Sequence, residues 1–203
     1  MSSDPDLRLG DLSPRSGAHY LAALHLYTAS FPASTRKPPT SLLALFDARR
    51  YRFFGASENE RLLGLAFVYT SQSPPFALLD YLATQPEARR RGVGKALFEH
   101  TAREIERTLP RAQGLLVEVD SADEKLLAWY GRLGARPIEG ISYLHPALDG
   151  GSPTPMQLLW LPFGGGRVTG PADLRAVVTE VFVGCHGQGI QDAVLARVLE
   201  SIG

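Results

Sequence analysis

The sequence predicts a mixed α/β fold with α+β character, made of one domain and a helical tail. Strand-like and helix-like runs alternate from residue 51 to residue 163. An apolar strand at 76–84 leads through a glycine-containing turn into an amphipathic helix. Three consecutive glycines then separate this region from two further helical patterns. We therefore expect a domain at 1–163, a glycine-rich linker at 164–170 and a helical tail at 171–203.

The first part of the chain is predicted to contain two helices and a hairpin. Apolar residues at helical spacing follow Pro14 and end near Phe31. Thr40 or Ser41 is placed to cap a second helix. Two strands joined by a polar turn are expected at 51–56 and 62–70, with the turn at 57–60.

The middle of the chain predicts the order strand, helix, strand, helix, strands. The helix that follows the 76–84 strand runs from Arg91 to about Leu109, and Pro110 ends its pattern. Gly134 closes the second helix. The later strand, helix and two last strands are expected at 114–120, 123–133, 135–143 and 156–163.

The tail predicts two amphipathic helices, one opening at Pro171 and one over 190–202, separated by the glycine-containing stretch 184–189. About thirty residues are too few to bury a core of their own. We therefore expect the tail to dock on its own domain or on a second subunit, and we favour a homodimer.

The turn at residues 89–96 predicts an anion site. Free N–H groups at a helix start, two glycines and four cationic side chains suit a phosphate. The spacing does not fit a P-loop, because Arg89 stands where the first glycine is needed and Ala96 follows Lys95. Nor does it fit a dinucleotide fingerprint, since Leu97 occupies the place of the third glycine. A basic, solvated helix start is the alternative.

What the segment Arg89-Arg90-Arg91-Gly92-Val93-Gly94 does match is the pattern R/Q-x-x-G-x-G/A. It resembles the acetyl-CoA pyrophosphate loop of the GNAT superfamily of N-acetyltransferases. A second segment around Tyr130 is similar to the family's Y-x-x-x-G-F, although Ala135 replaces the phenylalanine and Asp123 stands where asparagine is common. Over about residues 7–163, the resemblance implies a central, mostly antiparallel sheet with a splayed parallel strand pair and flanking helices.

The resemblance implies that acetyl-CoA is the co-substrate and that the 76–84 strand and the following loop bind it. The implied cofactor-binding residues are Leu82, Ala83, Thr84, Arg89, Arg90, Arg91, Gly92, Val93, Gly94, Lys95, Ala96 and Tyr130. Tyr130 is also the implied acid, because a phenol with a pKa of about 10 is protonated at neutral pH and can protonate a departing thiolate. The alternative is that Tyr130 only packs against Trp129.

Asp80 is the tentative catalytic base. It shares a strand face with Leu82 and Thr84, and burial would have to raise its pKa to make it useful near neutrality. Equally, Asp80 could cap a bulge or orient a neighbouring tyrosine. Glu118 and Asp120 are further candidates, and a chain of water molecules could replace a single base.

The resemblance places the acceptor beside Phe31, the connector Thr35–Thr40, Tyr69 and Tyr143. The identity of the acceptor stays open between a small amine, an amino acid, and a protein N-terminus or lysine. A longer acyl group in place of acetyl also stays open.

Bulk properties exclude several classes of function. A net charge of +0 gives no general field for nucleic acid or an anionic membrane. One cysteine excludes an internal disulfide and a multi-cysteine zinc site. Residues 1–6 lack the features of a secretory signal and no apolar run reaches membrane-spanning length, so we expect a cytoplasmic protein.

Two histidines are expected to have no catalytic or metal-binding role. Cys185 and His186 are adjacent, and neighbours rarely present a nucleophile and a base to each other. His145 is expected in a loop, and no second histidine lies at metal spacing, so no metal is expected.

The function expected is an acetyl-CoA-dependent N-acetyltransferase that moves the acetyl group directly to a primary amine, without a covalent enzyme intermediate. The alternative is a non-catalytic acyl-CoA-binding sensor or interaction protein, because such a module would share every cofactor residue. A nucleotide-hydrolysing enzyme is a distant third hypothesis.

Overall fold

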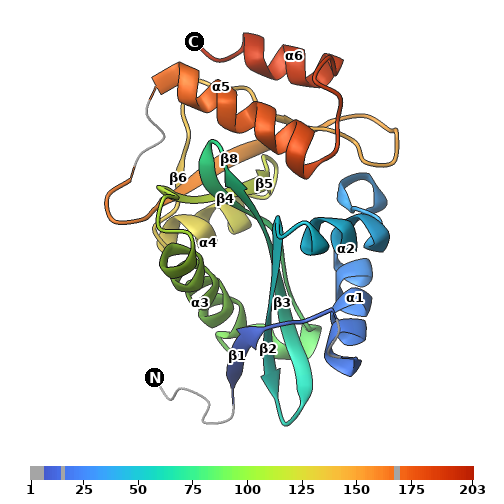
Figure 1. Cartoon of the computed structure of the whole chain (residues 1–203). Helices are drawn as coiled ribbons and strands as arrows, with labels where there is room; N and C mark the ends of the chain where they lie inside the picture. Colours follow the sequence, from blue (N-terminus) through green and yellow to red (C-terminus); the bar gives the residue numbers. More distant parts are fainter. Residues whose placement is uncertain (1–6, 15–16, 167–169) are drawn as a thin grey trace. The chain divides into compact units, whose positions relative to one another are not determined.

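The structure, a computed structural model, describes residues 7–14, 17–166 and 170–203 (Figure 1). Its elements in chain order are β1 Arg8–Asp11, α1 Ala18–Ser30, the 3₁₀ turn η1 Ala33–Thr35, α2 Pro39–Asp47, β2 Tyr51–Glu58, β3 Arg61–Gln72, β4 Pro75–Thr84, the 3₁₀ turn η2 Pro86–Ala88, α3 Val93–Thr108, β5 Gly114–Asp120, α4 Glu124–Arg132, β6 Arg136–Pro137, β7 Leu144–His145, β8 Thr154–Pro162, α5 Gly170–Glu180, the π-helix η3 Val181–Cys185 and α6 Ala193–Glu200.

The chain divides into two compact units. Unit 1 consists of Met1–Pro32, Pro38–Tyr69 and Leu79–Thr108, and unit 2 consists of Ala33–Lys37, Thr70–Leu78 and Leu109–Gly203. The described strands follow the order β1-β2-β3-β4-β5-β8-β6, with β7 paired to β8. Because β4 and β5 are parallel and the rest of the sheet is antiparallel, the mixed α/β class and the predicted strand arrangement are confirmed.

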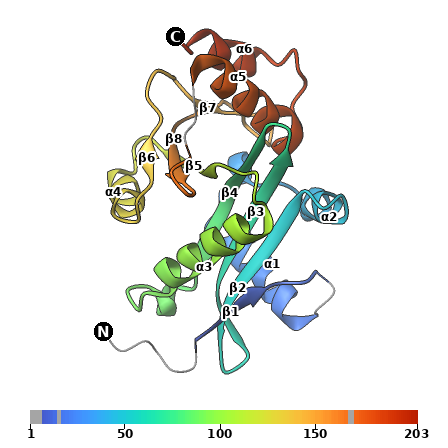
Figure 2. The same cartoon turned by 60° about the vertical axis from the view of Figure 1, so that its left-hand side comes forward.

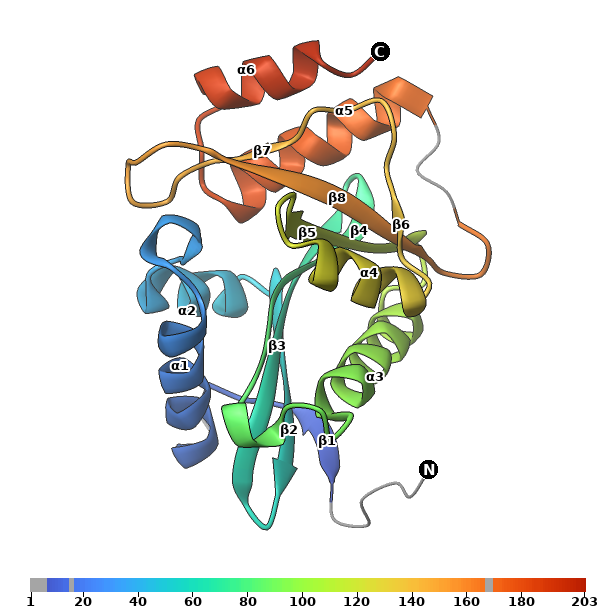
Figure 3. The same cartoon turned by 180° about the vertical axis from the view of Figure 1, so that it is seen from behind.

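In unit 1, helices cover both faces of the β2–β3 hairpin. Figures 1 and 3 show α1 and α2 on one face and α3 on the other. Side chains that alternate along β2 explain this arrangement. Phe53 stacks with Phe46 of α2 at a ring-centroid distance of 5.3 Å, whereas the next residue, Phe54, meets His100 of α3 edge-on at 6.0 Å.

The hairpin turns at Asn59-Glu60, where both residues have positive φ. Two left-handed residues in a two-residue turn match the right-handed twist of the flanking strands. The sequence did not predict β1, a four-residue strand whose register against β2 pairs Arg8 with Ser57 and Asp11 with Phe54.

In unit 2, the antiparallel pair β5–β8 carries helices on both sides. Figure 2 shows α4 on one side of these strands and α5 on the other. The predicted strand at 135–143 is wrong in most of its length. Only Arg136–Pro137 of this range forms a strand, although the N–H of Ile138 also donates to the carbonyl of Leu158 in β8 at 2.9 Å. The extended backbone is interrupted at Gly140, whose φ is 75°.

The tail buries its apolar residues inside unit 2. The buried side chains of α5, η3 and α6 are Leu174, Val177, Val178, Val181, Phe182, Leu195 and Val198. The Nη2 atom of Arg175 also donates to the carbonyl oxygen of Ile202 at 2.6 Å. Docking on the same chain therefore accounts for the apolar faces of these helices, while a homodimer stays a prediction. The predicted division into a domain at 1–163, a linker at 164–170 and a tail at 171–203 also stays a prediction. Residues 167–169 of that linker lie outside the described residues.

Candidate active site

The predicted cofactor loop lies in unit 1, between β4 and α3. The turn contains two left-handed residues, Arg90 at φ 64° and Gly92 at φ 84°. Gly92 adopts this conformation without the steric cost that a Cβ imposes. The first bond of α3 joins the N–H of Ala96 to the carbonyl of Gly92 at 2.9 Å. Within the described chain, no backbone oxygen accepts from the amides of 93–95, so these amides and the positive end of the helix dipole are available to an anion.

The four cations of this loop have different surroundings. Arg91 and Lys95 each pair with a glutamate, at 2.7 Å and 3.7 Å. Arg89 and Arg90 are exposed, and no residue in the described ranges forms an ion pair with either. These two guanidinium groups are therefore the ones that a phosphate can recruit without breaking a pair within the protein.

The strand before the loop is closely packed on one edge. A Cβ at Gly64 of β3 would lie 3.0 Å from the carbonyl oxygen of Ala83 and 3.4 Å from Cγ2 of Thr84. Asp80, Leu82 and Thr84 are half-buried, whereas Ala83 is buried. Asp80 thus shares its strand face with the residues predicted to face the pantetheine arm.

Asp80 accepts a hydrogen bond from the hydroxyl of Tyr51, a buried residue of β2. Tyr51 also packs edge-on against Tyr69 of β3, at a centroid distance of 6.0 Å, and Arg50 donates to the Tyr69 hydroxyl. A half-buried carboxylate therefore has a fixed phenolic donor.

Phe31, predicted on the acceptor side, lies just after α1. Its ring meets Tyr81 edge-on at 4.9 Å, and Tyr27 meets the same Tyr81 ring at 4.7 Å. The predicted acceptor connector is divided between the units, with Thr35 to Lys37 in unit 2 and Pro38 to Thr40 in unit 1.

The proposed acid, Tyr130, lies on α4 in unit 2 and is 5% exposed. Burial raises its pKa well above the ordinary phenol value. Its ring meets Trp129 edge-on, with centroids 4.8 Å apart. Asp123 caps this helix by accepting from the N–H of Leu126 at 2.9 Å, so the departure from asparagine retains a helix cap.

A family model decides the identity of the chain. The model for the acetyltransferase (GNAT) family matches residues 20–135, a range that contains the anion-binding turn and Tyr130. The chain belongs to the GNAT family of acetyltransferases. Acyl transfer with acetyl-CoA as co-substrate follows from that membership. No curated protein matches the chain in the corresponding comparison.

Solved structures of GNAT proteins share the fold. A protein from Bacteroides thetaiotaomicron assigned to the GNAT family has a TM-score of 0.72 at 20% identity, over 90% of this chain and 99% of that one. The ribosomal-protein-S18-alanine N-acetyltransferase of Escherichia coli has a TM-score of 0.58 at 23% identity, over 78% and 96% of the two chains.

A third GNAT relative shows the co-substrate. The structure of an acetyltransferase from Elizabethkingia anophelis contains bound acetyl-CoA, with a TM-score of 0.56 at 14% identity, over 78% and 99% of the two chains. In the described part of the present GNAT chain, no helix is both long enough and apolar enough to cross a bilayer.

The structure also reveals a buried polar cluster in unit 2 that the sequence did not predict. The side chain of Glu118 is 6% exposed, and its Oε1 atom lies 3.2 Å from Nε2 of His186. The hydroxyl of Tyr143 donates to the same oxygen. Lys37, itself 3% exposed, places Nζ 3.1 Å from Nδ1 of His186. His145 completes the cluster, with its ring centroid 4.5 Å from that of His186.

Electrostatics in this cluster fix the charge of Glu118. Burial alone would raise the pKa of the carboxyl group, but the charge and hydrogen bond of His186 outweigh it and hold the pKa at about 2. His145 and Tyr143 add smaller effects in the same direction. The pKa of His145 is lowered to about 4, first by burial and then by His186, which keeps that imidazole neutral near pH 7.

One expectation about these histidines is wrong, and another agrees with the structure. His145 is a buried member of β7, not a loop residue, and it lies beside His186 although the two are far apart in sequence. As expected, His186 is not arranged as a base for the adjacent cysteine, because its two ring nitrogens face Lys37 and Glu118. The cluster combines several distant segments, so no spacing rule identifies it.

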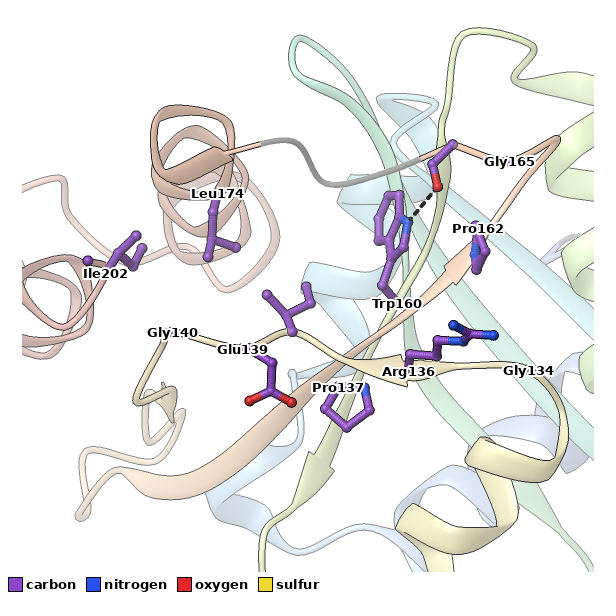
Figure 4. Close-up of a pocket in the computed structure, with 13 residues that line it drawn as sticks. Gly134, Arg136, Pro137, Glu139, Gly140, Trp160, Pro162, Gly165, Leu174 and Ile202 are labelled. Atoms are coloured by element: carbon purple, nitrogen blue, oxygen red, sulfur yellow. Dashed lines mark hydrogen bonds between the residues drawn. The ribbon is translucent and has the colours of Figure 1, made fainter.

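Unit 2 also contains an open apolar pocket of about 800 Å³ (Figure 4). Trp160 of β8 lies on one side, and its Nε1 donates to the carbonyl oxygen of Gly166 at 3.4 Å. Leu174 of α5 and Ile202 lie on the other side. None of the predicted site residues lines this pocket.

Proposed function

We propose that this GNAT protein transfers an acetyl group from acetyl-CoA directly to a primary amine. The observation that carries the proposal is the turn before α3, where unpaired amides, a left-handed Gly92 and two exposed arginines form an anion site. One similar structure supports an amine acceptor, since it is that of the ribosomal-protein-S18-alanine N-acetyltransferase of Escherichia coli.

In this proposal, the residues 89–96 and the strand residues 82–84 hold acetyl-CoA. The neutral amine attacks the thioester carbonyl, a C–N bond forms, the C–S bond breaks, and coenzyme A leaves as the thiolate. Tyr130 gives its hydroxyl proton to that thiolate, and the acetylated nitrogen then loses its extra proton, which restores the phenol by way of solvent. Its raised pKa keeps the phenol protonated over the whole physiological range and also makes it a weaker acid than an ordinary tyrosine.

The ammonium form of the acceptor must lose a proton before it attacks. We propose Asp80 for this step, because it is half-buried, is held by Tyr51 and shares a face with Leu82 and Thr84. Glu118 is the less suitable candidate, since a carboxyl group with a pKa of about 2 is a weak base near neutrality. Asp120 is exposed and lies at the end of β5.

Binding and turnover experiments test the proposal. Calorimetric titration of the full chain with acetyl-CoA, coenzyme A and ATP is expected to show binding of both coenzyme A species and none of ATP. A panel of small amines, amino acids and peptides is then expected to contain an acceptor that releases free thiol. Tight binding without thiol release over the whole panel would favour the non-catalytic acyl-CoA sensor instead.

We make two further proposals about this protein. The protein acts in the cytoplasm, and it forms a homodimer through its C-terminal helices. Ile190, which is 65% exposed, and Val183, which is 38% exposed, are apolar side chains of this region that a second subunit would cover. Light scattering of Ile190→Ser against the unchanged chain tests the second proposal, and a wild-type monomer at micromolar concentration would contradict it.

A further inference from the structure

The C-terminal segment brings a histidine into the core of unit 2. His186 follows the π-helix η3 directly and lies beyond residue 135, where the match to the family model ends. Within an α-helical run, single π-turns are rare and occur frequently at functional sites. Here the turn ends with the N–H of His186 donating to the carbonyl of Val181 at 2.9 Å, and the side chain of His186 is fully buried.

Lys37 and Glu118 determine which nitrogen of His186 carries the proton. An ammonium group can only donate, so Lys37 Nζ donates to Nδ1 across 3.1 Å. The remaining proton of a neutral imidazole is then on Nε2, which faces Glu118 Oε1 at 3.2 Å. The ring therefore connects the Lys37 ammonium to Glu118, and the buried carboxylate accepts a hydrogen bond from the imidazole.

Glu118 connects this pair to Tyr143. The Tyr143 hydroxyl donates to the same oxygen, Oε1, that faces His186. Tyr143 is 3% exposed, and its ring also packs edge-on against Phe182 of the π-helix, with centroids 6.0 Å apart. The C-terminal segment thus contacts Tyr143 twice, directly through Phe182 and indirectly through the carboxylate that His186 holds.

We propose that the C-terminal segment forms part of the acceptor side of the site. His186 is a positioning residue that keeps Glu118 in its carboxylate form. That carboxylate in turn fixes the Tyr143 hydroxyl. This inference rests on the proposed function and on the expectation from the sequence that Tyr143 lies on the acceptor side. It gives the segment a role within one chain, in shaping acceptor selectivity.

A metal centre is the strongest competing explanation of the cluster. One ligand atom each from Glu118, His145 and His186 lie within 4.8 Å of one another. However, the Lys37 ammonium lies against Nδ1 of His186, so the remaining ring nitrogen carries the proton that faces Glu118. A divalent ion would have to displace that proton and then lie close to a buried cation, which is unfavourable.

The first test measures the ionisation of Glu118 in the full chain and needs no acceptor. Glutamate labelled with ¹³C at the δ-carboxyl is followed by NMR from pH 4 to 8, and Glu118→Gln assigns the signal. The wild-type signal is expected to be unchanged over this range. In His186→Leu the signal is expected to titrate within it, because burial is no longer opposed. His186→Gln, which retains an N–H donor, is expected to restore most of the wild-type behaviour.

Val198→Ala is the matched control, since Val198 is fully buried in the same segment but is not a member of the cluster. An unchanged Glu118 signal in His186→Leu would overturn the inference, and so would equal titration in Val198→Ala. Loss of the wild-type His145 and His186 ring signals on addition of Zn²⁺ would also overturn it, in favour of a metal site.

The second test separates acceptor binding from cofactor binding. With an acceptor from the amine panel, His186→Leu is expected to raise the acceptor KM about tenfold, which corresponds to one lost hydrogen bond to a charged group. The Kd for acetyl-CoA is expected to stay within about twofold, as for Val198→Ala. An unchanged acceptor KM, or an equal loss of acetyl-CoA affinity, would overturn the inference. Failure of the wild type to bind acetyl-CoA would instead overturn the proposed function, while the NMR measurement still reports on the cluster.

Discussion

The hydroxyl of Tyr51 on β2 donates a hydrogen bond to Oδ2 of Asp80 on β4, although β3 lies between the two strands. The phenol therefore reaches across one strand of the sheet to hold a half-buried carboxylate. A donor in this place stabilises the ionised carboxyl group and fixes its orientation. Tyr51, the partner of the proposed base Asp80, can therefore be substituted without changing Asp80 itself.

Asp80→Asn is expected to lower kcat by about 100-fold, the usual loss when a general base is removed. Tyr51→Phe is expected to have a smaller effect on the maximal rate and to move the acid limb of the pH–rate profile to higher pH, because a donor to the charged form is lost. The measurement is kcat against pH for both variants. A profile for Asp80→Asn that matches the wild type would assign the proton to Glu118 or to water.

Arg89→Ala is expected to weaken acetyl-CoA binding about two- to fivefold, the range for an exposed ionic contact. The loss should shrink as salt is raised, because added ions screen exposed charges. Calorimetric titration at low and high salt measures both effects. Arg103→Ala, an exposed arginine farther along α3, is the control and should bind as the wild type does. Equal losses at both positions would mean that the loop provides only a general positive field.

Tyr130→Phe is expected to lower kcat by about 100-fold or more while the Kd for acetyl-CoA stays unchanged. Because burial raises the pKa of Tyr130, its ionisation should give no basic limb in the wild-type profile below about pH 10. Trp129→Phe, which changes the neighbouring ring only, controls for packing. A Tyr130→Phe variant with the wild-type kcat would leave the residue a packing role alone.

His145 makes stability depend on pH. Its folded pKa of about 4 lies below the ordinary value of 6.5, so the unfolded chain takes up a proton at a higher pH than the folded chain. Stability should therefore fall as the pH drops from 6.5 to 4 and then level off for this group. The loss amounts to about 3 kcal/mol. Urea unfolding at successive pH values measures it.

His145→Phe should remove most of this slope, because the phenyl ring does not titrate and Nδ1 of His145 has no hydrogen-bond partner in the described residues. His25→Asn, at an exposed histidine, is the control and should keep the wild-type slope. Glu118 acts in a lower window, since its stabilising ionisation is lost as the pH falls from about 4.5 to about 2. Retention of the full slope in His145→Phe would attribute it to other groups.

The sequence predicted the elements whose causes are local. The predicted anion-binding turn at 89–96 follows from adjacent cations and glycines, and the helix α4 follows from the pattern at 123–133 that Gly134 closes, so both are readable within a few residues. The strand at 135–143 failed beyond Pro137 because Gly140, with a positive φ of 75°, interrupts the extended backbone. β1 was missed because four residues at a sheet edge have too little pattern of their own.

The buried cluster could not be predicted, for a different reason. Glu118 lies on a predicted strand, but its partner His186 and the partner of that histidine, Lys37, come from opposite ends of the chain, 149 positions apart. The sequence analysis did single out Cys185-His186, but the partner of His186 in the structure is Glu118 and not the adjacent cysteine. Only tertiary packing joins such residues, because burial makes a charged group find a partner wherever the fold brings one.

Cys185 is the only cysteine of the sequence and is 2% exposed, at the end of the π-helix that presents His186. Because a buried thiol reacts with an alkylating reagent only when its surroundings open, the rate of labelling reports local unfolding of this segment. The alkylation rate of Cys185 is thus a natural probe of local unfolding beside the cluster, and it needs no engineered cysteine. Slower alkylation on addition of an amine would identify acceptors that close the segment, even before any turnover is measured.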